Sequence, residues 1–236
     1  MAARAPYIVP ALKKHTATVI MAHGLGDSGA GWMALAQNWR RRGIFEEVKF
    51  IFPNAPSIPI TVNMGMSMPG WYDISNLGSD LRSQDEPGIL RSREYFNSLV
   101  KAEMDSGIQS SRIVLGGFSQ GGAMSVFTGL TSDKKLGGVF GLSCYLLLSE
   151  QIKKFIPEQW ANKDTPFFLA HGDQDDIVKH VFGSKSAEKL KELGVTDVEF
   201  NTYPDLGHSA DPLEVHDLEK FLGKVLPPQE SQSSGL

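Results

Sequence analysis

The chain has 236 residues, of which 41% are hydrophobic and 21% are charged, and its formal net charge is −4. This length fits one large α/β domain, and the small negative charge excludes the basic footprint of a nucleic-acid-binding protein. The single cysteine, Cys144, excludes an internal disulfide bond and a cysteine-based zinc site.

Short apolar runs alternate with amphipathic segments along the chain. The apolar runs predict buried strands at 18–22, 48–52, 113–115, 138–142 and 166–170, and alternating side chains predict a further strand at 198–203. Apolar residues at helical spacing predict helices over 31–42, 88–104, 184–193 and 218–226, and another with an apolar start at 123–127. This alternation predicts an α/β fold: a mostly parallel central sheet covered by helices on both faces, in one domain over 1–228.

Three segments lack such periodicity. Residues 58–74 are predicted to form a long irregular excursion rich in proline, glycine and methionine, and residues 78–87 a polar, mobile loop. The polar residues 229–236 are predicted to be a disordered tail. No stretch has the apolar length of a signal-peptide core or a membrane span, so we expect a cytoplasmic protein.

The excursion places Met64, Met66, Met68 and Trp71 within eight positions. Methionine side chains are flexible and polarisable, and they line adaptable apolar surfaces. The residues alone allow two interpretations. Either these four side chains form the wall of a site for an acyl chain, or they fill gaps in the core beneath a long loop.

The segment between the strand at 113–115 and the following helix carries the pattern Gly117-x-Ser119-x-Gly121. In such a nucleophile elbow the chain reverses in one tight turn, which leaves no room for side chains at the two glycines. The serine hydroxyl then stands clear of the backbone at a helix N-terminus, where a developing negative charge is favoured. Because the pattern is short, its prediction of a catalytic serine depends on partners further along the chain.

An acid and a histidine follow at the carboxyl ends of later strands, in the order Ser, Asp, His that α/β hydrolases use. The spacing of three residues after Gly172 favours Asp175 as the acid, with Asp173 bonded to loop backbone and Asp176 in solvent. His208 is favoured as the base because it lies in a Gly-His-Ser turn before the last helix. Other histidines are predicted to be packing or surface residues: His23, His171, His180 and His216.

The predicted mechanism uses protein groups alone and no metal or organic cofactor. His208 removes the proton of Ser119 as the serine attacks a carbonyl, and Asp175 holds the imidazole tautomer and stabilises the imidazolium. The backbone N–H groups of Gln120, directly after the nucleophile, and of Leu25, in an early glycine-rich loop, are predicted to hold the oxyanion.

Together these residues resemble the acyl-protein thioesterases of the phospholipase/carboxylesterase group. Four motifs carry the resemblance: HGLGDSGAGW at 23–32, PGWYDI at 69–74, LGGFSQGGA at 115–123 and HGDQD at 171–175. The resemblance implies hydrolysis of palmitoyl thioesters on protein cysteines, with lysophospholipase and ester hydrolysis as side activities. It also implies S-palmitoylated substrates such as G-protein subunits, a nuclear as well as cytoplasmic location, and an acyl-chain tunnel formed with the methionine-rich excursion.

Two departures from the family pattern bear on function. Asp176 stands where the family often has proline, which alters the acid loop but keeps Asp175. No cysteine lies near the N-terminus, so we expect transient contact with a membrane surface in place of self-acylation. Two rival functions remain: a carboxylesterase or lysophospholipase would share the triad, and a non-catalytic binding module would have a broken one.

Overall fold

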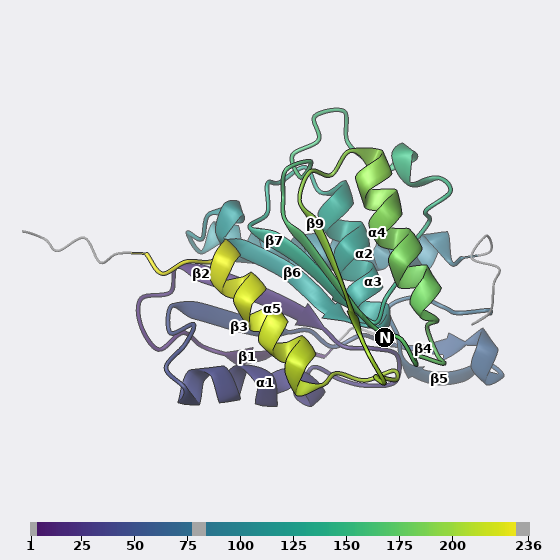
Figure 1. The fold of residues 1–236 in the computed structure, drawn as a ribbon, viewed down its shortest axis with the longest axis horizontal. Coiled ribbons are helices and arrows are strands. Elements are labelled where there is room, and N and C mark those ends of the chain that lie inside the picture. The colour runs from purple at the N-terminus through teal and green to yellow at the C-terminus, as the bar shows by residue number, and fades with distance from the viewer. Residues whose placement is uncertain (1–3, 77–83, 230–236) are drawn as a thin grey trace, which may run out of the picture.

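Seven strands form one sheet in the order β1-β3-β2-β6-β7-β8-β9 (Figure 1), in a computed structural model that describes residues 4–76 and 84–229. Strand β1 runs antiparallel to β3, and the other neighbouring pairs of this sheet are parallel. The α/β fold predicted from the sequence is therefore confirmed. The strands are β1 (Tyr7–Val9), β2 (Ala17–Ala22), β3 (Val48–Phe52), β6 (Ile113–Phe118), β7 (Gly138–Leu142), β8 (Phe167–Gly172) and β9 (Val198–Tyr203).

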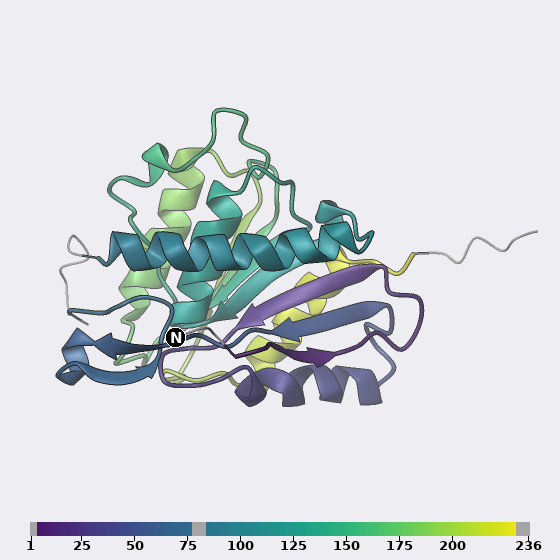
Figure 2. The same cartoon turned by 180° about the vertical axis from the view of Figure 1, so that it is seen from behind.

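Helices cover both faces of this sheet (Figure 1 and Figure 2). Helices α1 (Ala30–Arg41) and α5 (Pro212–Val225) contribute to one apolar cluster, and α2 (Glu86–Asp105), α3 (Gln120–Thr131) and α4 (His180–Leu193) contribute to the other. Strands buried on both sides need apolar residues at consecutive positions, and all six residues of β2 and of β8 are buried. Helix α3 is buried along its whole length, so its N-terminus is held firmly against the sheet.

Capping side chains set two helix starts that apolar periodicity does not show. Asp85 precedes α2 and accepts a hydrogen bond from the N–H of Gly88 at 2.9 Å. Asp211 precedes α5 and accepts from the N–H of Glu214 at 2.8 Å. Such caps stabilise a helix by about 1 kcal/mol, and they explain why both helices begin before their predicted first residues.

Residues 57–69 form an antiparallel hairpin, so the prediction of an irregular excursion over 58–74 was wrong for all but its last five residues. Strand β4 (Ser57–Ile60) pairs with β5 (Met66–Pro69), and the chain turns through Met64 and Gly65, whose φ angles are 56° and 73°. Each strand contains a proline, which cannot donate to a ladder. These prolines and the shortness of the strands hide the pairing from a sequence pattern.

Two predicted segments fall largely outside the described residues. Of the predicted mobile loop at 78–87, residues 78–83 lie outside them, and residues 86 and 87 belong to α2. Of the predicted tail at 229–236, only Gln229 is described. Across 4–76 and 84–229, no helix combines the length and the hydropathy that crossing a bilayer would need.

Candidate active site

Ser119 occupies the turn between β6 and α3, with φ 54° and ψ −121°. A residue other than glycine rarely has a positive φ, and this strain is typical of a nucleophile elbow. The flanking glycines permit the close approach: a Cβ on Gly117 or Gly121 would lie 2.5 Å or 2.3 Å from the carbonyl oxygen of Ala22. The predicted tight turn is present, and it places Ser119 at the N-terminus of α3.

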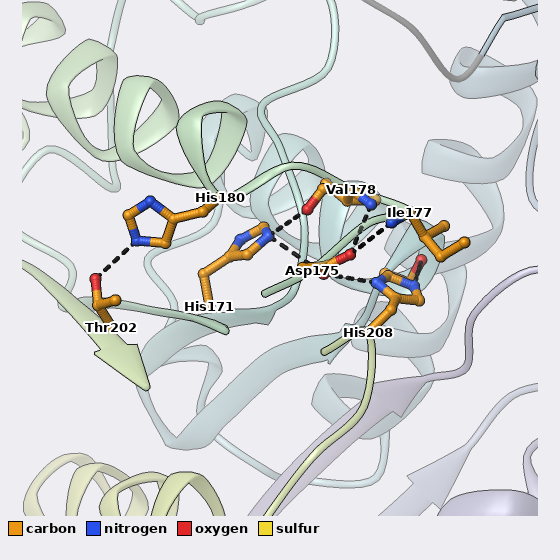
Figure 3. A network of polar contacts seen from close by, with 8 residues as sticks. His171, Asp175, Ile177, Val178, His180, Thr202 and His208 are labelled. Carbon is orange, nitrogen blue, oxygen red and sulfur yellow. Dashed lines mark hydrogen bonds and ion pairs between the residues drawn. The ribbon is translucent and has the colours of Figure 1, made fainter. Parts of the chain in front are cut away.

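The structure brings the predicted serine, histidine and acid together at the carboxyl ends of three strands. His208 Nε2 lies 2.9 Å from Ser119 Oγ. On the other side of the ring, His208 Nδ1 lies 2.7 Å from Oδ2 of Asp175 (Figure 3). The histidine ring rests on Phe118, with 4.9 Å between the ring centroids. These distances fit a serine hydroxyl that donates to Nε2 and an Nδ1–H that donates to the carboxylate.

The carboxylate of Asp175 is buried and fully engaged. Its Oδ1 accepts from the N–H groups of Ile177 and Val178, at 2.9 Å and 2.8 Å. Burial alone would raise the pKa of Asp175, but hydrogen bonds from His171, His208 and the Val178 N–H lower it well below its ordinary value. Asp175 is therefore ionised at neutral pH and can stabilise a positive charge on His208.

The two competing carboxylates lie away from this chain of hydrogen bonds. Asp173 is exposed and accepts from the N–H of Asp205 at 2.8 Å, which is the loop role predicted for it. Asp176 is exposed, as predicted. Among the described acidic residues, Asp175 alone bonds to His208.

The glycine-rich loop after β2 brings Leu25 to the same site. His23 holds this loop: it is fully buried, and its Nε2 accepts from the N–H of Ala55 at 3.1 Å. Burial lowers the pKa of His23, in keeping with a neutral, packed ring. The backbone N–H groups of Leu25 and Gln120 have no acceptor among the described residues, and both residues line the cavity at the serine.

The side chain of Gln120 has a structural role that the sequence pattern did not reveal. Its Oε1 accepts from the backbone N–H of Trp71 at 2.7 Å, and its Nε2 donates to the carbonyl oxygen of Tyr72 at 2.7 Å. The indole N–H of Trp71 in turn donates to the carbonyl oxygen of His23 at 2.8 Å. Gln120 thus joins the segment that follows β5 to helix α3, and Trp71 joins the same segment to the glycine-rich loop.

A cavity of about 540 Å³ opens beside Ser119. Its volume lies within the range of small-molecule sites, about 300–1,000 Å³. Aromatic and aliphatic side chains dominate its wall: Trp32, Val62, Tyr72, Ile74, Phe118, Tyr145, Ile177, Val178 and Phe182. These residues could not be recognised as a group in the sequence, because they come from a strand, helices and loops far apart in the chain and no local spacing joins them.

The four residues predicted as an acyl-chain wall do not line this cavity. Of the described residues that line the cavity, none is Met64, Met66, Met68 or Trp71. Met64 and Met66 are 88% and 55% exposed on the hairpin, and Trp71 is buried in the core, as the alternative interpretation predicted for it. The hairpin reaches the cavity through Val62, before its turn.

The carboxyl ends of β6, β8 and β9 each lead to one member of the hydrogen-bonded chain, in the sequence order Ser, Asp, His. This chain order, on a mostly parallel sheet with a strained serine turn, is that of the α/β hydrolases. The family model described as Phospholipase/Carboxylesterase matches residues 3–226. The chain therefore belongs to the phospholipase/carboxylesterase family.

Individual relatives agree with this assignment. The chain is 71% identical to acyl-protein thioesterase 1 of Emericella nidulans, over 98% of this chain and 99% of that protein. It is 66% identical to acyl-protein thioesterase 1 of Aspergillus fumigatus, over 99% and 98%. The crystal structure of Zea mays acyl-protein thioesterase 2 matches with a TM-score of 0.85 and 28% identity, covering 94% of this chain and 98% of that chain. The resemblance predicted from four sequence motifs is confirmed.

Proposed function

We propose that this protein is a serine hydrolase that cleaves long-chain fatty acyl thioesters, palmitoyl above all, from the cysteines of S-acylated proteins. The observation that carries the proposal is the hydrogen-bonded chain from Ser119 through His208 to Asp175, beside a mainly apolar cavity. The shared name of relatives at 71% and 66% identity supports the same chemistry. A non-catalytic binding module would have no need of such a chain.

Acylation begins when Ser119 Oγ attacks the thioester carbonyl and His208 Nε2 takes the hydroxyl proton. Ionised Asp175 keeps the imidazole in the required tautomer and stabilises the imidazolium that forms. The backbone N–H groups of Leu25 and Gln120 receive the oxyanion. As the tetrahedral intermediate collapses, His208 returns the proton to the cysteine sulfur, and the acyl group stays on Ser119.

Deacylation repeats the same steps with water as the nucleophile. His208 takes a proton from the water as it attacks the acyl-serine, and it then returns that proton to Ser119 as the fatty acid leaves. The protein groups named here supply every proton transfer in both half-reactions.

The acyl chain lies in the cavity beside the serine. The residues that replace the predicted methionines as its wall include Val62, Ile74, Tyr145 and Phe182. Each methylene that leaves water for such a wall contributes about 0.8 kcal/mol. The cavity therefore favours long over short acyl groups, although ordering the chain offsets part of the gain.

Exposed apolar side chains among the cavity-lining residues, or next to them in sequence, suit a brief encounter with a membrane surface. Ile177 lines the cavity and is 49% exposed, and Val181, in the first turn of α4, is 46% exposed. Met64 follows the cavity residue Asn63 directly. The protein acts in the cytoplasm and meets S-palmitoylated proteins, G-protein subunits among them, through transient contact with the membranes that carry them.

Side-by-side kinetics on an S-palmitoylated peptide and a lysophospholipid test this proposal, with Ser119→Ala as the background control. The proposal predicts the higher kcat/KM for the peptide thioester. A higher kcat/KM for the lysophospholipid would contradict it and indicate a lysophospholipase. Equal values for acetyl and palmitoyl thioesters would indicate a general carboxylesterase.

A further inference from the structure

His171 lies near the end of β8, beside Asp175, and it takes no part in the proton transfers proposed for the reaction. Its side chain is 1% exposed. Its Nε2 lies 2.7 Å from the carbonyl oxygen of Val178 and 3.3 Å from Oδ2 of Asp175 (Figure 3). Both neighbours are hydrogen-bond acceptors, so Nε2 carries a proton and donates it toward them.

This N–H group links strand β8 to the acid loop, residues 173–179, which carries Asp175. Val178 receives it on its carbonyl oxygen, and its own N–H donates to Oδ1 of Asp175 at 2.8 Å. The other carboxylate oxygen, Oδ2, faces His171 and also accepts from His208 Nδ1 at 2.7 Å. The carboxylate is thus held by its own loop through Val178 and by the sheet through His171, and it presents Oδ2 to His208.

Helix α4 makes room for the His171 ring with a glycine. A Cβ on Gly183 would lie 2.4 Å from His171 Nδ1, which is closer than real Cβ contacts come. Glycine within a helix is destabilising relative to alanine. The need to seat the imidazole against the helix explains why this weak helix former stands there.

We propose that His171 is a positioning residue of the triad: it donates from Nε2 to the acid loop and fixes the Asp175 carboxylate in the orientation that meets His208. This inference rests on the proposed hydrolase function. His171 is not among the described residues that line the cavity, so its loss should slow the reaction and leave substrate binding largely intact. A displacement of about 1 Å in a catalytic group can cost about 10²-fold in rate.

Two substitutions separate the hydrogen bond from the space that the ring fills. His171→Leu removes the donor, and His171→Gln keeps an amide N–H within reach of the same acceptors. We expect His171→Leu to lower kcat by about 10²-fold with KM within about twofold, and His171→Gln to recover about tenfold of that loss. His180→Gln is the matched control, because His180 bonds to Thr202 Oγ1 at 2.8 Å and not to the acid; its kcat should equal that of the wild type.

A pair of glycine substitutions tests the same geometry with the histidine retained, should His171→Leu fail to fold. Gly183→Ala pushes a methyl group into the ring and should lower kcat with little change in KM. Gly223→Ala is the control, since this glycine also lies in a helix and a Cβ there would meet nothing within 4 Å. It should leave kcat unchanged and raise the melting temperature, because alanine is the better helix former.

Proton NMR gives a readout that loss of packing alone would not move. The hydrogen-bonded Nδ1 proton of His208 should resonate far downfield in the wild type and in His180→Gln, and should shift or broaden in His171→Leu and Gly183→Ala. Wild-type kcat and an unchanged resonance in His171→Leu would overturn the inference, as would a loss that glutamine does not recover. If the wild type itself showed no turnover and no reaction of Ser119 with a fluorophosphonate, the proposed function would have failed instead.

Discussion

Three aspartates lie within four residues, and their surroundings decide which one the site can use. Asp175 is 4% exposed, accepts two backbone N–H groups and faces a histidine, whereas Asp173 and Asp176 are exposed to solvent. A buried carboxylate that keeps its charge needs such partners. The spacing after Gly172 singled out the same residue, because it encodes the tight loop that turns this carboxylate inward.

Asparagine substitutions at these three positions should therefore differ sharply in effect. In Asp175→Asn the imidazole of His208 loses the partner that fixes its tautomer, and kcat should fall by about 10⁴-fold. Asp173→Asn and Asp176→Asn serve as matched controls, and each should retain kcat within about tenfold of the wild type. Steady-state kinetics on one ester substrate measures all three, and Asp176→Asn as the slowest would mean that the acid is misassigned.

At the scale of elements, the elbow and the hairpin show what a local pattern can predict. Gly117 and Gly121 follow from one steric rule about a single turn, so their role could be predicted from five residues. The hairpin of β4 and β5 depends on pairing between two short proline-containing strands, and the cavity wall depends on which side chains the folded chain brings inward. Neither the strand pairing nor the cavity wall can be predicted from the spacing of neighbouring residues.

The corrected wall leads to a paired prediction. Ile74 lines the cavity, whereas Met66 is 55% exposed and does not. Ile74→Ser should lower the preference for palmitoyl over acetyl thioesters by about tenfold, which corresponds to about 1.4 kcal/mol of lost apolar contact. Met66→Ser should leave this ratio unchanged for water-soluble peptides. The ratio of kcat/KM values for the two thioesters measures the effect. A ratio that falls in Met66→Ser and not in Ile74→Ser would contradict this prediction and indicate that the methionines form the wall.

At the scale of the whole molecule, the sheet was predictable because its central strands are buried on both faces and β9 at its edge alternates. The ranges predicted for β3, β7 and β9 coincide with the observed strands. Strand β1, with three residues at the antiparallel edge, was missed because so short a segment carries no periodicity. Helices α1 and α5 were each predicted from the sequence, but the contact between them could not be, because it forms only in the folded chain. Glu219 of α5 accepts hydrogen bonds from Trp39 Nε1 at 3.0 Å and from Arg42 Nη1 at 2.7 Å.

One buried acid makes the stability of the whole fold depend on pH. Glu214 in α5 is fully buried, and within the described chain neither of its carboxylate oxygens has a hydrogen-bond partner. Burial, helped by the charges of Asp211 and Asp175, raises the pKa of Glu214 to about 8. The folded protein therefore holds this proton at a pH where the unfolded chain has released it.

This proton predicts the sign of a pH effect. Between the ordinary glutamate value of 4.5 and about 8, the folded state binds more protons than the unfolded state at Glu214. The free energy of unfolding should therefore fall with rising pH, by up to about 1.4 kcal/mol per unit from this group. In urea denaturation at about pH 5, 6.5 and 8, Glu214→Gln should gain stability relative to the wild type as pH rises. The control Glu188→Gln, at an exposed position of α4, should show a flat difference; a flat difference for Glu214→Gln would contradict the account.

The central claim is that Ser119 carries the acyl group, and mass spectrometry of the labelled protein tests it most directly. After reaction with a fluorophosphonate, the adduct should lie on the peptide that contains Ser119, and hydrolysis of a palmitoylated peptide should disappear in parallel. Ser119→Ala should remain folded, take no label and lose about 10⁴-fold or more in kcat. An adduct on another serine, or palmitoyl-peptide hydrolysis that persists in folded Ser119→Ala, would contradict the account.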